Sequence, residues 1–206
     1  MKNRKSCFTL LGLFALCLAM ALPAQAQSNT TGLFLNAHLS GNSINYDFEE
    51  FNAFEDESDT GGGLGLQIGY GFSPLVTIFL GANRASMDSD DVEDAYALWH
   101  VDLGTQLNFQ SGRSAAVPYG VIALSARQVK FETNGGDINF NGGGVTLGGG
   151  IKYFLAPEFA LDLGLTGTFG PFNNIEAGGI TVDIDNINAT SVRLGLGLSF
   201  FPSPRR

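Results

Sequence analysis

The stretch GVTLGGGIKYFLAPEFALDLGL, residues 144–165, contains the pattern that decides the fold. Up to Leu155 every second residue is apolar or glycine, and after Ala156-Pro157-Glu158 the alternation resumes at Phe159. A side-chain period of two is typical of a β-strand, and a proline in a short connection is typical of a tight turn. The stretch therefore predicts an antiparallel hairpin with a three-residue turn.

The charges in this hairpin agree with its register. If Leu155 faces Phe159, then Lys152 lies opposite Asp162 on the other face of the hairpin. Opposite charges at facing positions stabilise an antiparallel pair by about 0.2–1 kcal/mol. The two faces of the hairpin thus predict the same register.

The same alternation recurs along the chain, and short connections between strands alternate with long ones. Short connections with a central proline lie at 73–75 and 156–158, and long polar stretches lie at 42–62, 84–94, 132–142 and 170–188. This layout is typical of an up-and-down transmembrane β-barrel. We predict eight antiparallel strands at about residues 31–41, 63–72, 76–84, 95–109, 117–131, 142–155, 159–169 and 189–201.

The non-apolar face of these strands indicates whether the apolar face meets lipid outside the barrel or packs inside it. It carries mainly Gly, Thr, Ser and Gln, which suit a narrow interior better than a solvated surface. A lipocalin-like barrel, with its apolar side chains inside, is therefore the weaker interpretation. In the ambiguous fifth strand we place Ile122, Leu124 and Ala126 outward, since the other register turns Arg127 toward lipid.

The few polar residues with large side chains on the inner face predict a structural network inside the barrel. We expect the charges there to neutralise one another, because buried charges are usually paired, although a proton or ion path is an alternative. The predicted interior residues are Asn36, His100, Asp102, Gln106, Arg127, Lys152, Asp162 and Arg193.

Aromatic residues gather near the short turns, where a girdle at one membrane interface is expected. The alternative is ordinary core packing at the strand ends. The predicted interface aromatics are Tyr70, Phe72, Phe109, Tyr153, Phe159 and Phe200, with Tyr119 at the same level.

The N-terminal segment predicts export. Basic residues precede an apolar run from Cys7 to Leu22, and Ala24-Gln25-Ala26 fits a cleavage site. We expect residues 1–26 to be a cleaved signal peptide and residues 27–206 one barrel domain. Both cysteines would leave with the signal, so the mature chain would form no disulfide.

The charge is strongly acidic and lies mostly outside the predicted strands. The net charge is -9, which argues against a nucleic-acid partner. Seventeen of the twenty acids fall in the four long stretches and would form an acidic crown. Residues 88–94 lack the glycine and the spaced glutamate of an EF-hand, so solvated loop charge is the better interpretation. Aromatics among the acids at 46–51 leave contact with an extracellular partner open.

Four segments carry a resemblance to a known family. The chain resembles the small eight-stranded outer-membrane β-barrels of Gram-negative bacteria, the OmpA-like, OmpX-like and opacity-antigen-like proteins of the porin family. The matching segments are 69–74, 117–120, 152–157 and the last strand, 193–200. The resemblance implies location in the cell outer membrane, contact with lipid and lipopolysaccharide, and recognition by the outer-membrane insertion machinery through Arg193, Gly195, Leu198 and Phe200. Unlike many family members, the chain continues past the terminal aromatic with residues 201–206.

These features favour a monomeric, non-catalytic surface barrel without a cofactor or metal, in a structural, adhesive or antigen-like role. An eight-stranded interior is only wide enough for side chains, so a general pore is not expected. Two alternatives remain open. One is a lipid-A-modifying enzyme, for which His38 and His100 are the available histidines of the mature chain; the other is a narrow-channel or small-ligand barrel.

Overall fold

The computed structural model describes residues 30–47, 58–88, 95–109, 114–133 and 136–202. The predicted signal peptide lies outside these residues. Within the described ranges, no helix has the length and apolar character needed to cross a bilayer.

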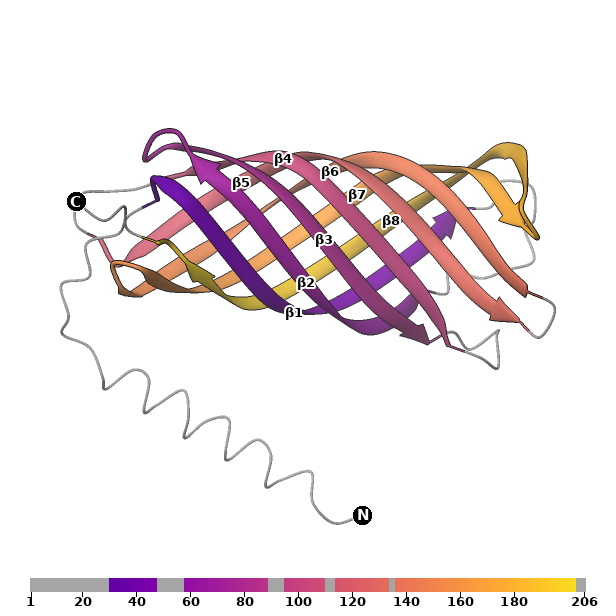
Figure 1. The fold of residues 1–206 in the computed structure, drawn as a ribbon, viewed down its shortest axis with the longest axis horizontal. Coiled ribbons are helices and arrows are strands. Elements are labelled where there is room, and N and C mark those ends of the chain that lie inside the picture. Colours follow the sequence, from indigo (N-terminus) through magenta and orange to yellow (C-terminus); the bar gives the residue numbers. More distant parts are fainter. Residues whose placement is uncertain (1–29, 48–57, 89–94, 110–113, 134–135, 203–206) are drawn as a thin grey trace, which may run out of the picture.

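The described chain is a closed antiparallel barrel (Figure 1). Each strand pairs with the next, and the first pairs with the last from Leu35–Phe200 to Asp47–Asn188. Within the closed wall no strand edge is left unpaired. The strands are β1 (Gly32–Asp47), β2 (Asp59–Gly71), β3 (Val76–Asp88), β4 (Tyr96–Asn108), β5 (Ala116–Thr133), β6 (Gly136–Ala156), β7 (Phe159–Ala177) and β8 (Ile180–Phe200).

The middle of the barrel turns its apolar side chains outward. Leu66 and Leu124 are 67% and 69% exposed, whereas Lys152 on the inner face is 1% exposed. In β5 the outward residues include Ile122 and Leu124, and Arg127 is buried, which confirms the register predicted for that strand. A lipocalin-like arrangement is thereby excluded for the described strands.

One end of the barrel has short connections (Figure 1), and Phe201, which follows β8, bonds the turn residue Glu158 there. We call it the short-turn end. The predicted facing of Leu155 and Phe159 is wrong: Phe159 pairs with Ala156, and the register shifts between Phe154 and Ala156. The bulge shortens the turn to Pro157-Glu158 and keeps both Leu155 and Phe159 on the outer face. The rest of the hairpin, including Lys152 opposite Asp162, has the predicted register.

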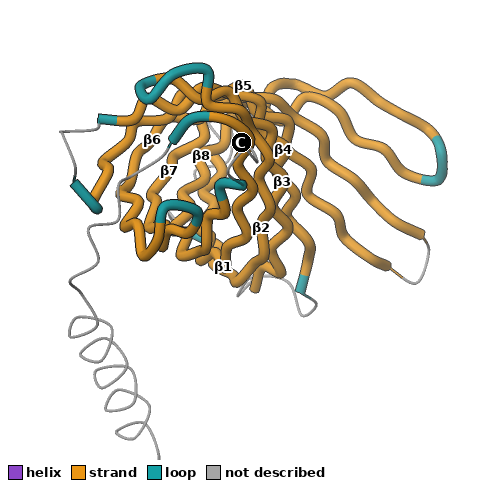
Figure 2. Tube along the Cα trace, turned by 60° about the vertical axis from the view of Figure 1, so that its left-hand side comes forward, coloured by secondary structure: helices purple, strands orange, loops and turns teal. Residues whose placement is uncertain are grey.

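At the other end, the long-loop end, the strands run well past their predicted limits. β1 continues to Asp47, β6 begins at Gly136, and β7 and β8 are joined only by Gly178-Gly179. β5 with β6 and β7 with β8 continue as hairpins, and these paired strands project beyond the closed wall (Figure 2). Both glycines have positive φ, 58° and 80°, which suits a tight two-residue hairpin turn.

Where the structure describes them, the stretches predicted as long loops are mostly strand, because the pattern inverts. Ile44, Met87 and Phe172 lie on the inner face and are at most 1% exposed, while Ser86 and Asp88 face outward. Strands that leave the apolar belt keep their ladder but bury apolar residues inside. A search for outward apolar residues therefore ends each strand too early.

A charge on the outer face of the belt tests this orientation. We expect Leu124→Arg to lower the free energy of unfolding by about 2–4 kcal/mol, because a guanidinium near the bilayer midplane is poorly solvated. Urea unfolding in liposomes measures the change. Ser86→Arg, on the outer face beyond the belt, is the control and should be nearly neutral. Equal destabilisation by both variants would contradict the orientation.

Candidate functional site: the barrel interior

An apolar cluster fills the short-turn end of the interior. Phe201, which follows β8, is 3% exposed and lies 5.8 Å from Phe34 and 5.3 Å from Phe154 between ring centroids. Its amide donates to the carbonyl of Glu158 at 2.7 Å. The residue beyond the family's usual terminal aromatic is thus part of the barrel's packing. The short-turn cluster is Phe34, Phe79, Val117, Ala123, Phe154, Ala160 and Phe201.

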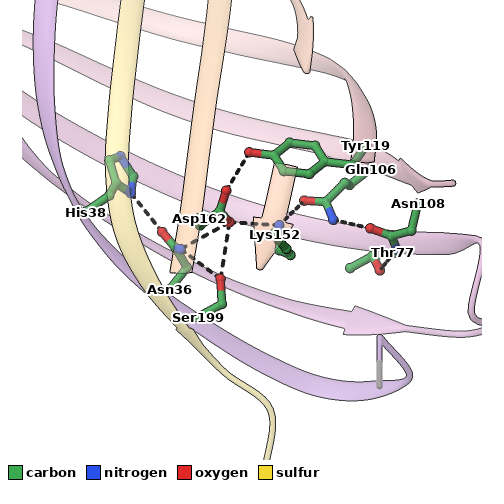
Figure 3. Close-up of polar contacts among 9 residues, drawn as sticks. All are labelled: Asn36, His38, Thr77, Gln106, Asn108, Tyr119, Lys152, Asp162 and Ser199. Carbon is green, nitrogen blue, oxygen red and sulfur yellow. Dashed lines mark hydrogen bonds and ion pairs between the residues drawn. The ribbon is translucent and has the colours of Figure 1, made fainter. Parts of the chain in front are cut away.

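A buried ion pair lies next to this cluster (Figure 3). Lys152 Nζ is 2.8 Å from Asp162 Oδ2, and the two side chains are 1% and 9% exposed. Asp162 also accepts hydrogen bonds from Tyr119 at 2.7 Å, Ser199 at 3.2 Å and Asn36 at 3.4 Å. These donors satisfy the carboxylate where water is scarce, so the pair has the support that a buried charge requires.

A chain of amides extends from the ammonium group across the interior (Figure 3). Lys152 donates to Gln106 at 2.9 Å, Gln106 donates to Asn108, and Asn108 donates to Thr77 at 3.1 Å. Lys152 Nζ also lies 4.0 Å from the ring centroid of Tyr119. The ammonium is held from several sides and has little freedom to move.

A second ion pair lies nearer the long-loop end. Arg193 donates to Asp102 at 2.6 Å, and Ser125 donates to the other carboxylate oxygen at 2.6 Å. The hydroxyl groups of Ser125, Thr146 and Thr168 continue the network at 2.5 and 2.6 Å. Small hydroxyl residues thus link β5, β6 and β7 across the inner wall.

Two predicted interior residues do not join these ion pairs. Arg127 donates to the backbone carbonyls of Ala189, at 3.1 Å, and Gly170, and its guanidinium lies 4.9 Å from the Phe172 ring centroid. His100 is fully buried, and its ring nitrogens have no hydrogen-bond partner among the described residues. Of the five predicted interior charges, four therefore form two pairs and Arg127 is held by carbonyl groups.

The second histidine, His38, is also held inside the wall. Its Nδ1 lies 2.9 Å from Asn36 Oδ1 (Figure 3). Its ring lies against Gly65, where a Cβ would be only 2.1 Å from Nε2. A side chain at position 65 would have to displace the His38 ring, because the ring takes its space.

The free space between the ion pairs is small. A cavity of about 70 Å³ is lined mainly by polar residues, among them Asn36, His38, Asp102 and Asp162. It has room for a few water molecules. Toward the long-loop end the interior closes again with a second apolar cluster: Ile44, Ala85, Met87, Tyr96, Leu98, Val129, Phe172 and Ala189.

An apolar pocket of about 270 Å³ opens beside this second cluster. Its polar groups are the Tyr46 hydroxyl group and the hydrogen bond from Tyr96 to Asp59 at 2.5 Å. Burial raises the pKa of Tyr46 to about 12 and also raises the pKa of Tyr96, so both hydroxyl groups are neutral near pH 7. The sequence prediction missed this pocket; the inverted alternation was the signal for it. Its lining residues are Tyr46, Asp59, Tyr96, Val129, Phe131, Phe140, Phe172 and Ile187.

The predicted interface aromatics lie around the short-turn end. Tyr70, Phe72, Phe109, Phe159 and Phe200 are on the outer face, and Tyr153 is half-buried. Phe159 and Phe200 contact each other, with ring centroids 4.9 Å apart. Tyr119 differs, because its hydroxyl group bonds Asp162 inside the barrel. In the last strand Arg193 points inward and Leu198 and Phe200 point outward.

Removing one partner of the buried ion pair should cost far more than removing an exposed one. We expect Asp162→Asn to destabilise the barrel by about 3–5 kcal/mol, because Lys152 keeps its charge without a counter-ion. Asp137→Asn, which breaks the exposed pair with Lys130, should cost at most about 1 kcal/mol. Urea unfolding in liposomes compares the two. The double variant Lys152→Met/Asp162→Leu should recover much of the loss, and an unchanged midpoint for Asp162→Asn would refute the structural role.

Comparisons with known proteins agree with this architecture. The family described as "Outer membrane protein beta-barrel domain" matches residues 12–200. Neisserial surface protein A has a similar fold, with a TM-score of 0.66 at 16% identity over 82% of this chain and 97% of that one. AlkL, an outer membrane protein solved in DMPC lipid bilayers, gives 0.55 at 15% identity over 90% and 97%. OprG from Pseudomonas aeruginosa gives 0.53 at 16% identity over 86% and 100%. No curated protein sequence matches the chain at a significant level.

The match covers most of the chain, and the structure has the closed wall, the outward apolar belt and the polar interior of a membrane-spanning barrel. The chain belongs to the outer membrane protein beta-barrel domain family, and its place is the outer membrane of the cell.

Proposed function

We propose that this protein is a closed, non-catalytic surface barrel that acts through its long-loop end, outside the cell. The observation that carries the proposal is the filled interior. Apolar clusters close both ends, and two ion pairs with their hydrogen bonds occupy the space between. A solute crossing the barrel would have to break these contacts, so the described interior favours a scaffold over a pore.

The histidines support a structural role over lipid-A chemistry. A hydrolase of this kind needs a serine whose hydroxyl group is activated by a histidine at hydrogen-bond distance. Ser40 lies two residues from His38, but its Oγ accepts bonds from Asn42 at 2.9 Å and Asn83 at 2.8 Å. His38 bonds Asn36 instead. Ser40 is buried in the inner wall. His38 also borders an apolar groove on the lipid side, but its hydrogen bond is to Asn36 and not to a serine.

The outer rim supports contact with positively charged partners. Apart from the interior residues Asp102 and Asp162, the acidic residues of the described strands lie at the long-loop end, and the sequence places more acids at 49–57 and 90–94. A negative rim attracts cationic groups or divalent ions and repels nucleic acid. The described rim acids are Asp59, Asp88, Asp137, Glu176 and Asp183.

Assembly and association belong to the same proposal. The last strand, with Gly195 inside and Leu198 and Phe200 on the outer face, supports recognition by the outer-membrane insertion machinery. Closure of the wall by β1 and β8 completes the barrel within one chain, which supports a monomer.

The closed interior predicts an absence of channel activity. Purified protein in planar bilayers should give no steady conductance steps under an applied voltage, because the polar layer and both apolar clusters block the axis. A general porin in the same bilayers is the positive control. Stable open-channel steps from the folded, heat-modifiable protein would contradict the closed barrel.

The apolar pocket at the rim favours a second candidate, capture of a small aromatic ligand. Its volume is close to the lower end of ligand pockets, and its wall is largely aromatic, with two tyrosine hydroxyl groups and the Asp59 carboxylate as polar groups. The Tyr96–Asp59 pair could exchange hydrogen bonds with a hydroxyl group on such a ligand.

This candidate predicts saturable binding of a probe such as 2-naphthol. Ile187→Trp should weaken binding at least about tenfold, because the larger ring fills the pocket. Ile180→Trp, at the exposed hairpin tip, is the matched control and should leave binding unchanged. Saturation-transfer NMR on protein in nanodiscs measures both. Equal binding by the two variants would remove the pocket from consideration.

A further inference from the structure

Of the two cations on the described outer wall, one has no carboxylate partner. Among the described residues, Arg84 and Lys130 are the cations whose side chains lie on the outer face. Lys130 pairs with Asp137 at 2.7 Å. Arg84 is exposed, and no carboxylate of the described residues pairs with it; its contact is the ring of Trp99, whose centroid is 5.4 Å from the guanidinium carbon.

Arg84 lies where the apolar belt ends. Its partners across the ladder are Leu64 on β2 and Trp99 on β4, and the next outward residue along β3 is Ser86. Trp99 and Phe109 are ten residues apart along β4 and its continuation. At a rise of about 3.4 Å per residue and a strand tilt of about 40°, they lie about 25 Å apart along the barrel axis, which is the height of a barrel's apolar band. Phe109 belongs to the aromatics of the short-turn end, so Arg84 stands at the opposite interface.

A groove runs from Arg84 along the wall toward the membrane interior. It has a volume of about 630 Å³ and a lining that is almost entirely apolar. It lies over the small outward residues Ala37 and Ala82, which are surrounded by larger leucines. Arg84 and Trp99 form its end at the outer interface, while Leu66 and Leu198 lie lower. The leucines of its wall are Leu39, Leu64, Leu66, Leu196 and Leu198.

We propose that Arg84, Trp99 and this groove bind a phosphorylated glycolipid of the outer leaflet, of the lipid A type. The guanidinium would take a phosphate group at headgroup height, and an acyl chain would lie in the groove. Guanidinium groups match phosphate oxygens in a two-pronged geometry, and an indole ring is stable at this interface. The proposal rests on the outer-membrane location and is independent of what the rim binds.

The charge distribution favours a lipid over a second copy of the chain. A two-fold dimer within the membrane has its axis along the membrane normal, so both copies of Arg84 would meet at the same height and repel. The rim next to the groove is acidic and repels an anionic headgroup. On the described outer wall, Arg84 is the cation without an ionic partner, so an anionic headgroup would bind there. An acyl chain also fits the lining, in which apolar residues and glycines outnumber the polar residues His38, Asn83 and Arg84.

Native mass spectrometry of the full mature protein with bis-phosphorylated lipid A tests the assignment. Wild type and Lys130→Gln should bind alike, Arg84→Gln should bind about tenfold more weakly, and Arg84→Lys should lie between them. Dephosphorylated lipid A should bind weakly and equally to wild type and Arg84→Gln. Trp99 is the single tryptophan of the chain, so the fluorescence of the protein reports on this site. Brominated acyl chains should quench the wild-type fluorescence more strongly when they belong to phosphorylated lipid A than when they belong to dephosphorylated lipid A.

Three results would overturn the proposal: equal binding by Arg84→Gln and wild type, equal binding of phosphorylated and dephosphorylated lipid A, or a protein dimer that excludes lipid. All variants must keep the heat-dependent gel shift of the folded barrel. Conductance and rim binding are measured separately, so failure here leaves the surface-barrel proposal unaffected.

Discussion

The whole structure depends on hydrogen bonding of the backbone in a medium without water. A bilayer offers no partners for N–H and C=O groups, so a strand can cross it only when both of its edges are paired. The β1–β8 ladder, from Leu35–Phe200 to Asp47–Asn188, meets this requirement by closing the sheet. Once the sheet is closed, each residue has only two directions, toward lipid or toward the axis, and the period of two decides which side chains take which.

An eight-stranded wall leaves so little room that side chains must fill its interior as they fill a protein core. Small residues on the inner face make space for a few large ones, as at Gly65, whose missing side chain admits the ring of His38. Charges remain there when neighbouring groups neutralise or hydrogen-bond them. Lys152 and Asp162 have such partners, and Phe201 seals the space below them. The packing that stabilises the barrel also blocks its interior. Binding surfaces are therefore expected at the rim and on the outer wall.

The change of environment along each strand explains where the sequence prediction failed. In the membrane, apolar residues face out; beyond it they face in, as Ile44 and Phe172 do. A pattern sought only as outward leucines therefore stops at the belt, and polar residues beyond it resemble loop. The rim pocket and its Tyr96–Asp59 contact went unnoticed for this reason.

The sequence by itself determined the strand period, the face that meets lipid and the pairing of Lys152 with Asp162, because these follow from local alternation and from one hairpin's register. Only the tertiary structure decided the contacts across the barrel. Arg193 meets Asp102 from a strand 91 residues away, Arg127 finds carbonyl groups, and Tyr119 turns inward. Such contacts depend on how the strands are staggered around the closed wall, and no short stretch of sequence encodes that stagger.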